Sequence, residues 1–325
     1  MAKYMLTGAA GFIGSRVCDL LLEDGHSVVG IDNINNAYDI RLKEYRLKRL
    51  KNHKGFQFYQ KDVADLDSLE EIACQSGKID AIINLAARAG VRASVENPWI
   101  FLQTNTTGTL NLLEIARKYG IPKFVLASTS SIYGSNAPLP TTEEADSSHP
   151  LQPYAASKKA AETMCYSYHF LHGIDVTVFR YFTVFGPAGR PDMVMFRFVQ
   201  WIAECRKVHL NGDGTQSRGF TYVDDIARGT IAGLKPLGYE IINLGGHDVI
   251  TINDMITILE KMLGKKADVI HHPAHPADMM TNWADVTKAK EMLGWQPQVS
   301  LEEGMQATVD WYLKERSWAS QVETL

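Results

Sequence analysis

The sequence predicts an α/β protein with a Rossmann-type, doubly wound parallel sheet followed by a smaller C-terminal α/β substrate domain. In the first half of the 325 residues, short apolar runs alternate with helical patterns of ten or more residues. That alternation is typical of a parallel sheet covered by helices on both faces. A glycine-rich turn follows the first apolar run, and the regular alternation ends after about Phe182. We therefore expect two units joined near that residue.

The strands and helices of the first unit follow the apolar pattern in order. Short runs rich in β-branched and aromatic residues predict six strands, at Tyr4–Leu6, Val28–Asp32, Phe56–Gln60, Ala81–Leu85, Phe124–Ser128 and Val176–Tyr181. Longer stretches with helical spacing lie between them, at Ser15–Asp24, Leu66–Gln75, Trp99–Tyr119 and Pro153–Leu171. Gly25 and Gly120 fall just past two of these helices, where a left-handed cap residue is expected.

The second half predicts a looser arrangement of helices and short strands. Its expected elements are Val194–Cys205, Val208–Leu210, Phe220–Val223, Ile252–Leu263 and Leu301–Glu315. Residues 1–181 are expected to form the first domain and residues 182–325 most of the second. A stretch near 220–247 is expected to return to the first domain.

The composition and charge exclude several classes of protein. With 22% charged residues and a net charge of −4, the chain lacks the basic bias of a nucleic-acid binder. The N-terminus leads straight into an apolar strand, and no run approaches the roughly 20 apolar residues that a membrane span needs. We expect a cytoplasmic protein with no nucleic-acid or membrane partner.

No metal site is expected, and one basic segment is assigned no function. The four cysteines form no C-x-x-C pair, and His271, His272 and His275 lie among prolines without further ligands at matching spacing. Between Arg41 and Lys54, basic residues are interspersed with leucines. That pattern predicts an amphipathic helix with a solvated basic face.

A glycine-rich segment reading T-G-A-A-G-F-I-G lies between the first strand and the first helix. Glycines in that position let the backbone approach a pyrophosphate, which rests at the positive end of the helix dipole. The segment therefore predicts a dinucleotide-binding loop. The residues expected to contact the cofactor there are Gly8, Gly11, Phe12, Ile13 and Gly14.

Asp32 ends the second strand, eighteen residues after the last glycine of this loop. A carboxylate in that position accepts hydrogen bonds from both hydroxyls of an adenosine ribose and repels a 2′-phosphate. The next residue is Asn33 and no arginine follows closely. NAD is therefore favoured over NADP.

Tyr154 and Lys158 stand one turn apart on one face of the expected Pro153–Leu171 helix. A nearby ammonium favours a phenolate, so the pair predicts a tyrosine with a lowered pKa that acts as a general base. The run S-T-S-S-I-Y-G starts at Ser128 and ends the fifth strand, at the edge where doubly wound sheets bind ligands. The hydroxyl of Thr129 in this run can hold a sugar oxygen against the tyrosine.

The G-x-x-G-x-x-G spacing, the S-T-S-S-I-Y-G run and the Y-x-x-x-K pair together resemble the extended short-chain dehydrogenases, over the whole chain. The resemblance implies that Thr129 contacts a substrate hydroxyl, Tyr154 is the base, and Lys158 tunes it and holds the nicotinamide ribose of NAD. The N-L-A-A segment beginning at Asn84 resembles the family's H-L-A-A segment, with asparagine replacing histidine. Further implied cofactor contacts are Asp62, Val63, Leu85, Ala86 and Ala87.

Within this family, the residues after the fifth strand separate the reactions. Dehydratases carry S-T-D-E-V-Y-G there, and sugar-nucleotide decarboxylases keep a glutamate. This chain has Ser130 and Ser131 instead, and hydroxyls cannot serve as carboxylate acids or bases. The resemblance therefore implies a 4-epimerase that removes a hydride from C4 of a nucleotide sugar and returns it to the other face.

Two further segments bear on the sugar: F-T-V-F-G-P, starting at Phe182, and G-R-P-D-M, starting at Gly189. With Y-A-A-S-K-K-A, they resemble the UDP-glucuronate 4-epimerases. A uronate carboxylate needs charge-assisted donors, which an arginine supplies in a planar fork. The residues expected at a UDP-glucuronate or UDP-galacturonate substrate are Arg88, Thr129, Ser130, Ser131, Thr183, Arg190, Arg218 and Asp278. Gly219 departs from the family's R-D-[FY] at the diphosphate arginine.

Three alternatives stay open at this point. A UDP-glucose/UDP-galactose 4-epimerase would use Arg190 only structurally, and a UDP-glucuronate decarboxylase would release CO2. A catalytically silent NAD-sensing regulator would need no tyrosine–lysine pair. By resemblance, we also expect a homodimer in which two long helices of each subunit, Trp99–Tyr119 and Pro153–Leu171, form a four-helix bundle.

Overall fold

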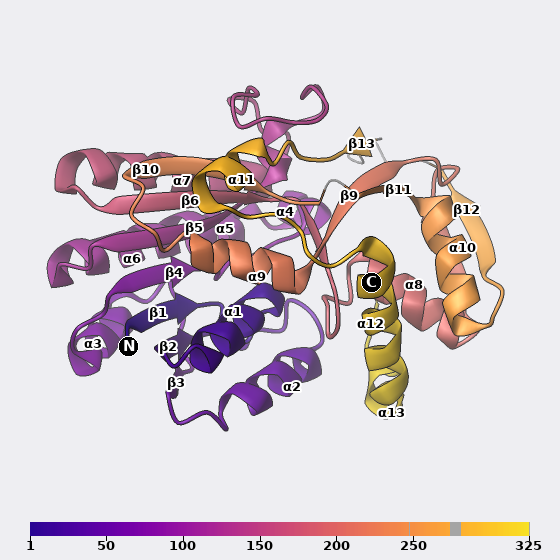
Figure 1. Cartoon of the computed structure of the whole chain (residues 1–325), viewed down its shortest axis with the longest axis horizontal. Helices are drawn as coiled ribbons and strands as arrows, with labels where there is room; N and C mark the ends of the chain where they lie inside the picture. The colour runs from indigo at the N-terminus through magenta and orange to yellow at the C-terminus, as the bar shows by residue number, and fades with distance from the viewer. Residues whose placement is uncertain (247, 274–280, 325) are drawn as a thin grey trace.

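The computed structural model describes residues 1–246, 248–273 and 281–324. Its centre is a parallel sheet of seven strands in the order β10-β6-β5-β4-β1-β2-β3 (Figure 1). Within the sheet, every neighbouring pair is parallel. The strands are β1 (Lys3–Thr7), β2 (Ser27–Ile31), β3 (Phe56–Tyr59), β4 (Ala81–Asn84), β5 (Lys123–Thr129), β6 (Asp175–Tyr181) and β10 (Tyr239–Leu244). The Rossmann-type sheet and all six predicted strands are confirmed.

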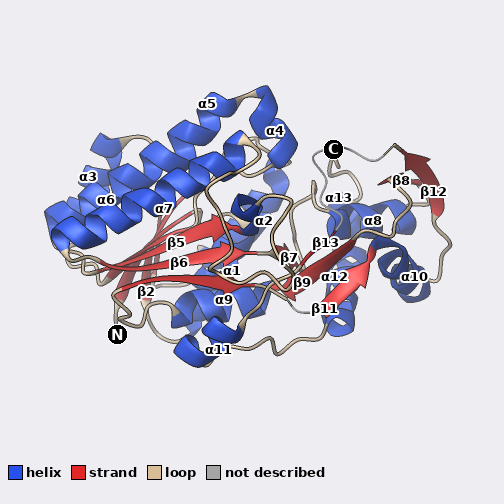
Figure 2. Cartoon of the chain, turned by 90° about the horizontal axis from the view of Figure 1, so that it is seen from above, coloured by secondary structure: helices blue, strands red, loops and turns tan. Residues whose placement is uncertain are grey.

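Helices cover both faces of this sheet (Figure 2). One face packs on α3 (Leu66–Ser76), α6 (Gly108–Tyr119) and α7 (Pro153–His172), and the other on α1 (Phe12–Glu23), α9 (Val223–Ala232) and α11 (Thr287–Leu293). Successive strand residues point to opposite faces. Met5 accordingly belongs to the first apolar core and Leu6 to the second. The near-continuous apolar strands in the sequence reflect burial on both sides.

The predicted helix Trp99–Tyr119 is interrupted by a π-helical turn. It consists of α5 (Pro98–Phe101), a π segment η1 (Leu102–Thr107) and then α6, preceded by the short helix α4 (Val91–Glu96). The buried side chain of Asn105 lies in the π segment. π turns of this kind occur frequently at functional sites.

The helix α2 (Ile40–Leu50) forms where the basic run was predicted to be helical, but its basic face is not wholly solvated. Lys43 and Arg46 are buried together with Leu42, Leu47 and Leu50. The prediction of a solvated face is therefore wrong for these two residues. It failed because hydrogen-bond acceptors from distant segments lie against the helix.

The second unit has its own sheets, helices and apolar core. Strand β9 (Ser217–Tyr222) pairs with β7 (Thr183–Phe185), β11 (Asp248–Thr251) and β13 (Thr281–Asn282), and β8 (Lys207–Asn211) pairs with β12 (Asp268–His272). The surrounding helices are α8 (Val194–Ala203), α10 (Ile252–Leu263), α12 (Leu301–Lys314) and α13 (Arg316–Ala319). Strand β10 and helices α9 and α11 pack with the large sheet instead. No helix in the described parts of the chain is long and apolar enough to cross a membrane.

Candidate active site

The glycine-rich loop is held too tightly for larger residues. Gly8 has φ +75°, and a Cβ on it would lie 2.8 Å from the backbone nitrogen of Ala86. A Cβ on Gly14 would lie 2.0 Å from the carbonyl oxygen of Gly8. Gly11 forms the N-terminal cap of α1 without a side-chain hydrogen bond. The loop thus presents bare backbone at the helix N-terminus, as a bound pyrophosphate requires.

Asp32 lies buried beside this loop at the end of β2. Its Oδ2 accepts a hydrogen bond from the Ala10 amide at 3.1 Å, and its Oδ1 accepts one from the Ile34 amide at 2.8 Å. Nζ of Lys43 lies 3.8 Å from Oδ1. Burial lowers the pKa of Lys43, and the charge of Asp32 opposes that effect. Lys43 was missed by sequence reasoning, because eleven residues separate it from Asp32 and only the packing of α2 joins them.

The other predicted cofactor residues lie at the same edge of the sheet. Asn33 donates a hydrogen bond to Asp62 at 2.6 Å, which joins the ends of the second and third strands. The carbonyl of Val63 accepts a hydrogen bond from Asn111 at 3.0 Å. The segment Leu85–Ala87 directly follows β4 and faces Gly8. These contacts place the predicted NAD residues on one continuous rim.

Asn84, which replaces the family's histidine, connects the first strand to a helix. Its Oδ1 accepts a hydrogen bond from the Thr7 hydroxyl at 2.8 Å, and its Nδ2 donates to the Thr109 hydroxyl at 3.0 Å. The Thr7 hydroxyl in turn accepts from the Ala86 amide at 3.2 Å. The asparagine therefore orders the loop beside the glycines through its short amide.

Thr129, Tyr154 and Lys158 come together at the carboxyl end of β5. The Thr129 hydroxyl accepts a hydrogen bond from the Ser131 amide at 3.2 Å, which begins the 3-10 helix η2 (Ser130–Tyr133), and it lies within hydrogen-bonding reach of the Tyr154 phenol. Lys158 is 3% exposed and donates to the Ala127 carbonyl at 2.8 Å. The three side chains share one site, although they come from a strand end and a helix.

The pKa values of the tyrosine and the lysine are set mainly by burial. Burial raises the pKa of Tyr154, while Thr129 and the charge of Arg190 act in the opposite direction. The net direction is thus opposite to the lowering expected from Lys158. Burial lowers the pKa of Lys158 to about 8, against the opposing effect of Glu162. A lysine desolvated in this way is sensitive to any charge brought near it.

A buried ion pair behind the site was missed by sequence reasoning. Arg180 on β6 donates two hydrogen bonds to Glu162 on α7, at 3.1 and 2.9 Å, and both side chains are about 2% exposed. Glu162 also accepts a hydrogen bond from Ser128 at 2.5 Å. Arg180 further contacts the Tyr133 hydroxyl at 3.0 Å. The pair therefore fixes α7 against the strand end that carries Thr129.

Ser130 and Thr183 approach the site from different parts of the chain. The Ser130 hydroxyl accepts a hydrogen bond from Asn282 of β13 at 3.2 Å. Thr183 is half-buried at the start of β7, immediately after the Rossmann strand β6 and Phe182. Asn282 thus brings the second unit onto the strand end that carries Thr129, a contact that the sequence did not predict.

Arg190 lies close enough to Tyr154 for its charge to act on the phenol. Its guanidinium donates to both oxygens of Asp192, at 3.0 and 2.5 Å, and to the Ala89 carbonyl at 3.3 Å. It also lies over the ring of Tyr38 at 6.0 Å. Burial lowers the pKa of Arg190. The charge of Asp192 and its hydrogen bond raise that pKa by more, so the net pKa of Arg190 is raised.

The backbone of Arg88 is held by the π segment. The Arg88 amide donates to Oδ1 of Asn105 at 2.8 Å, and Nδ2 of Asn105 donates to the Arg88 carbonyl at 2.9 Å and to Ser157 at 2.9 Å. Ser157 directly precedes Lys158 on α7. Burial lowers the pKa of Arg88, opposed by Asp62. The π turn therefore ties a predicted substrate residue to the helix that carries Tyr154 and Lys158.

Arg218 lies on β9, between β11 and β13, and donates to the carbonyl of Ser217 at 2.7 Å. The unexpected Gly219 has a steric reason, because a Cβ there would lie 2.5 Å from the Gly246 carbonyl oxygen. Asp278, the remaining predicted substrate residue, lies outside the described residues. So does His275. In the described parts of the chain, no group of three or more His, Cys, Asp or Glu residues could hold a metal.

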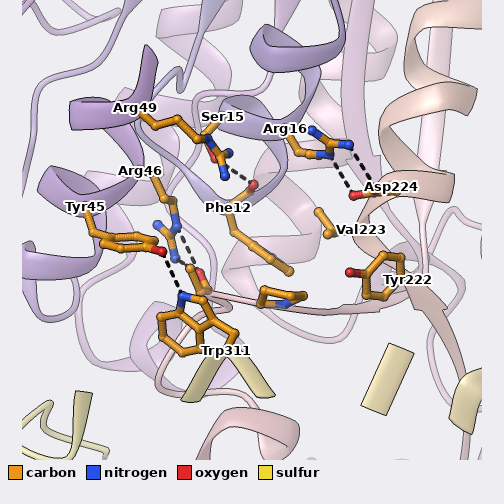
Figure 3. A pocket seen from close by; sticks show the side chains of 12 residues that line it. Phe12, Ser15, Arg16, Tyr45, Arg46, Arg49, Tyr222, Val223, Asp224 and Trp311 are labelled. Carbon is orange, nitrogen blue, oxygen red and sulfur yellow. Dashed lines mark hydrogen bonds and ion pairs between the residues drawn. The ribbon is translucent and has the colours of Figure 1, made fainter. Parts of the chain in front are cut away.

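A cavity of about 210 Å³ lies behind the glycine-rich loop (Figure 3). Arg46, which is 2% exposed, reaches past Phe12 and donates to the carbonyls of Ala10 at 3.3 Å and Ala188 at 3.0 and 2.5 Å. Trp311 of α12 donates to the Tyr45 hydroxyl at 3.2 Å at the far side of the cavity. Helix α2 therefore joins the cofactor loop to the segment that carries Arg190.

Comparisons with known proteins agree with this geometry. A UDP-glucuronate 4-epimerase of Thermodesulfobacterium geofontis is 55% identical over 312 residues, which cover 96% of each chain. The structure of the Bacillus cereus UDP-glucuronic acid 4-epimerase in complex with UDP-glucuronic acid and NAD is 37% identical with a TM-score of 0.89, covering 96% of this chain and 99% of that one. The Thermotoga maritima UDP-glucose 4-epimerase with UDP-glucose is 33% identical with a TM-score of 0.89, covering 97% and 99%.

A sequence model of the NAD dependent epimerase/dehydratase family matches residues 4–245, which is most of the chain. The match begins in β1 and ends just after β10, so it includes every strand of the large parallel sheet. This chain belongs to the NAD dependent epimerase/dehydratase family.

Proposed function

We propose that this protein is a UDP-glucuronate 4-epimerase that interconverts UDP-glucuronate and UDP-galacturonate with bound NAD. The observation that carries the proposal is the position of Arg190, whose guanidinium lies near enough to the Tyr154 phenol for its charge to lower the pKa of that phenol. When the C4 hydroxyl of a sugar lies at Tyr154, a cation at this position can bind a carboxylate on the same sugar ring. Ser130 and Ser131 carry hydroxyls at the two positions where dehydratases have acidic residues, so the site has no carboxylate there for proton transfer.

The chain's own residues handle the proton and the position of the sugar. Tyr154 accepts the proton of the C4 hydroxyl, and the Thr129 hydroxyl holds that oxygen in line. NAD held at the glycine-rich loop would supply the oxidation of C4 and its later reduction. When the 4-keto sugar, whose C4 carbonyl is planar, turns about its link to the diphosphate, it presents the opposite face of C4 for reduction, and Tyr154 returns the proton to the C4 oxygen. The reaction is therefore an isomerisation without net oxidation.

Restraint of the carboxylate has a chemical purpose in this mechanism. The 4-keto uronate is a β-keto acid, which loses CO2 readily. Donors from Arg190, Ser130 and Thr183 hold the carboxylate and limit its rotation into the geometry that favours loss of CO2. Residues 1–181, together with about 220–247, are assigned to NAD binding, and the remaining residues mainly to the UDP-sugar.

The direct test uses the purified protein and UDP-glucuronate without added NAD, followed by NMR of the sugar. We expect UDP-galacturonate to form, which would also demonstrate a retained cofactor. Formation of CO2 and a UDP-pentose would instead identify a decarboxylase. Turnover of UDP-glucose alone, with NAD added, would identify a neutral-sugar epimerase.

The role of Arg190 is tested by Arg190→Ala. We expect kcat/KM for UDP-glucuronate to fall by roughly 10²-fold or more, because a charge-assisted fork to the carboxylate is lost. Inhibition by UDP, which has no carboxylate, should be unchanged. An equal loss of UDP affinity would mean that Arg190 acts structurally.

We also propose a cytoplasmic homodimer. An apolar stripe is exposed along α5, η1 and α7, where Trp99 is 77% and Phe170 is 75% exposed and Leu102, Tyr166 and Leu171 are also exposed. Pairing two such stripes would bury them in a four-helix bundle. Sedimentation velocity should give a dimer for the protein and a monomer for the double variant Trp99→Glu, Phe170→Glu. A monomeric unsubstituted protein would contradict this assembly.

A further inference from the structure

The arginine assigned to the substrate's carboxylate already holds a carboxylate of the chain itself. Nε and Nη2 of Arg190 donate to Oδ1 and Oδ2 of Asp192, at 3.0 and 2.5 Å. This two-point geometry is the one that an incoming uronate carboxylate would use. A planar guanidinium cannot offer the same edge to both groups. Binding of a uronate through this edge therefore requires Asp192 to leave it.

Asp192 has a second cation within reach. Met193 caps the N-terminus of α8, so Asp192 occupies the position before the cap and Arg197 is the fourth residue of the helix. Side chains at these two positions regularly meet in folded proteins, where they form the hydrophobic staple. The charge of Asp192 raises the pKa of Arg197, against the lowering by burial. Arg197 is therefore the second arginine available to the Asp192 side chain.

Arg197 is a half-buried cation with an unused donor. Its Nε is buried and has no hydrogen-bond partner among the described residues. Its guanidinium stacks on the ring of Trp201 at 4.5 Å. Burial lowers the pKa of Arg197, and the charge of Arg92 lowers it further. A buried donor without an acceptor is rare in folded proteins, so the Arg197 Nε offers an unused donor to a neighbouring acceptor.

We propose that Asp192 exchanges partners: it holds Arg190 in the empty enzyme and moves to Arg197 when a uronate carboxylate takes its place. This inference rests on the proposed UDP-glucuronate activity. Arg190 and Asp192 each keep a partner in both states, so the exchange leaves neither of these charges unpaired at the sugar site. A neutral hexose has no group that can replace Asp192 on Arg190, and the exchange does not occur.

The second partner lowers the cost of admitting a uronate. When a uronate carboxylate displaces Asp192, Arg190 keeps a carboxylate partner and Arg197 gains one, so part of the lost Arg190–Asp192 contact is recovered. With a neutral sugar, Asp192 stays on Arg190 and Arg197 remains as it is in the empty enzyme. Arg197 therefore affects the binding of uronates and not the binding of neutral sugars.

A double-mutant cycle with Asp192→Asn and Arg197→Met tests the exchange. Asparagine competes weakly for a guanidinium, so Asp192→Asn should lower KM for UDP-glucuronate roughly tenfold. Arg197→Met keeps the packing on Trp201 but removes the second partner, so KM should rise. In the Asp192→Asn background, Arg197→Met should have no effect, because no carboxylate remains to be moved. The inhibition constant of UDP should be unchanged throughout.

Arg206→Met is the matched control, since Arg206 follows the same helix and binds the Ser320 carbonyl at 2.9 Å instead. It should leave KM unchanged. A higher or unchanged KM in Asp192→Asn would overturn the exchange, as would an undiminished effect of Arg197→Met in that background. In either case the unsubstituted enzyme would still epimerise UDP-glucuronate. Absence of that turnover would instead refute the proposed function, and the exchange with it.

Discussion

Replacing Lys158 by methionine should stabilise the NAD-free protein while abolishing turnover. Lys158 is 3% exposed, and burial lowers its pKa from the ordinary 10.5 to about 8. A shift of this size corresponds to about 3 kcal/mol of destabilisation wherever the lysine is charged in both states. Methionine fills a similar volume without charge, but it leaves the Ala127 carbonyl without its donor, at a cost of about 1 kcal/mol. The variant should therefore gain about 2 kcal/mol at pH 7.

The pH dependence of this gain has a definite sign. Between pH 8 and 10.5 the unfolded chain holds the lysine proton more tightly than the folded one, so the stability of the unsubstituted protein rises with pH in that window. The advantage of the variant should shrink by about 2 kcal/mol between pH 7 and pH 9.5. Below pH 8 the advantage should be constant.

Urea denaturation of both proteins, freed of NAD and followed at pH 7 and 9.5, measures these differences. Lys159→Met is the control, because Lys159 is the next residue on α7, is partly exposed and donates to Ser147 at 2.7 Å. Its effect should stay within about 0.5 kcal/mol and should not depend on pH. A Lys158→Met protein that is less stable at pH 7, or an advantage that persists unchanged at pH 9.5, would refute the reasoning.

Two further substitutions test the loop and the buried ion pair. Gly14→Ala places a Cβ 2.0 Å from the Gly8 carbonyl oxygen, so the purified variant should lose its NAD and should unfold at a lower urea concentration. The NAD content is measured by absorbance after denaturation. A variant that retains a full complement of NAD would contradict the tight packing of the loop. Arg180→Met leaves Glu162 buried without its arginine partner and should cost about 3–5 kcal/mol of unfolding free energy. Arg117→Met breaks an exposed pair and should leave the urea midpoint nearly unchanged. Equal shifts of the midpoint would show that the buried pair contributes nothing particular.

The regular elements were predictable because their signals are local. Each predicted strand of the large sheet lies within one or two residues of the observed one, since burial on both faces makes these runs apolar throughout. The π segment between Pro98 and Gly108 was not predictable. Its cause is tertiary, because Asn105 bonds the backbone of Arg88 and the side chain of Ser157. Helix α2 was predicted, but the burial of Lys43 and Arg46 depends on acceptors from distant segments.

The sequence by itself determined the parts of the site that neighbouring residues build. The glycine loop needs only a strand, a turn and a helix, and the Tyr154–Lys158 pair follows from helical spacing. Their roles in NAD binding and catalysis remain predictions that the experiments above test.

Only the tertiary structure decided which charges meet. The pairing of Arg180 with Glu162 and the approach of Lys43 to Asp32 join separate elements. Even Arg190 and Asp192, two residues apart, form their pair through side-chain conformations that the spacing does not specify. Charged side chains are long and have many rotamers, and burial decides which partner each one keeps.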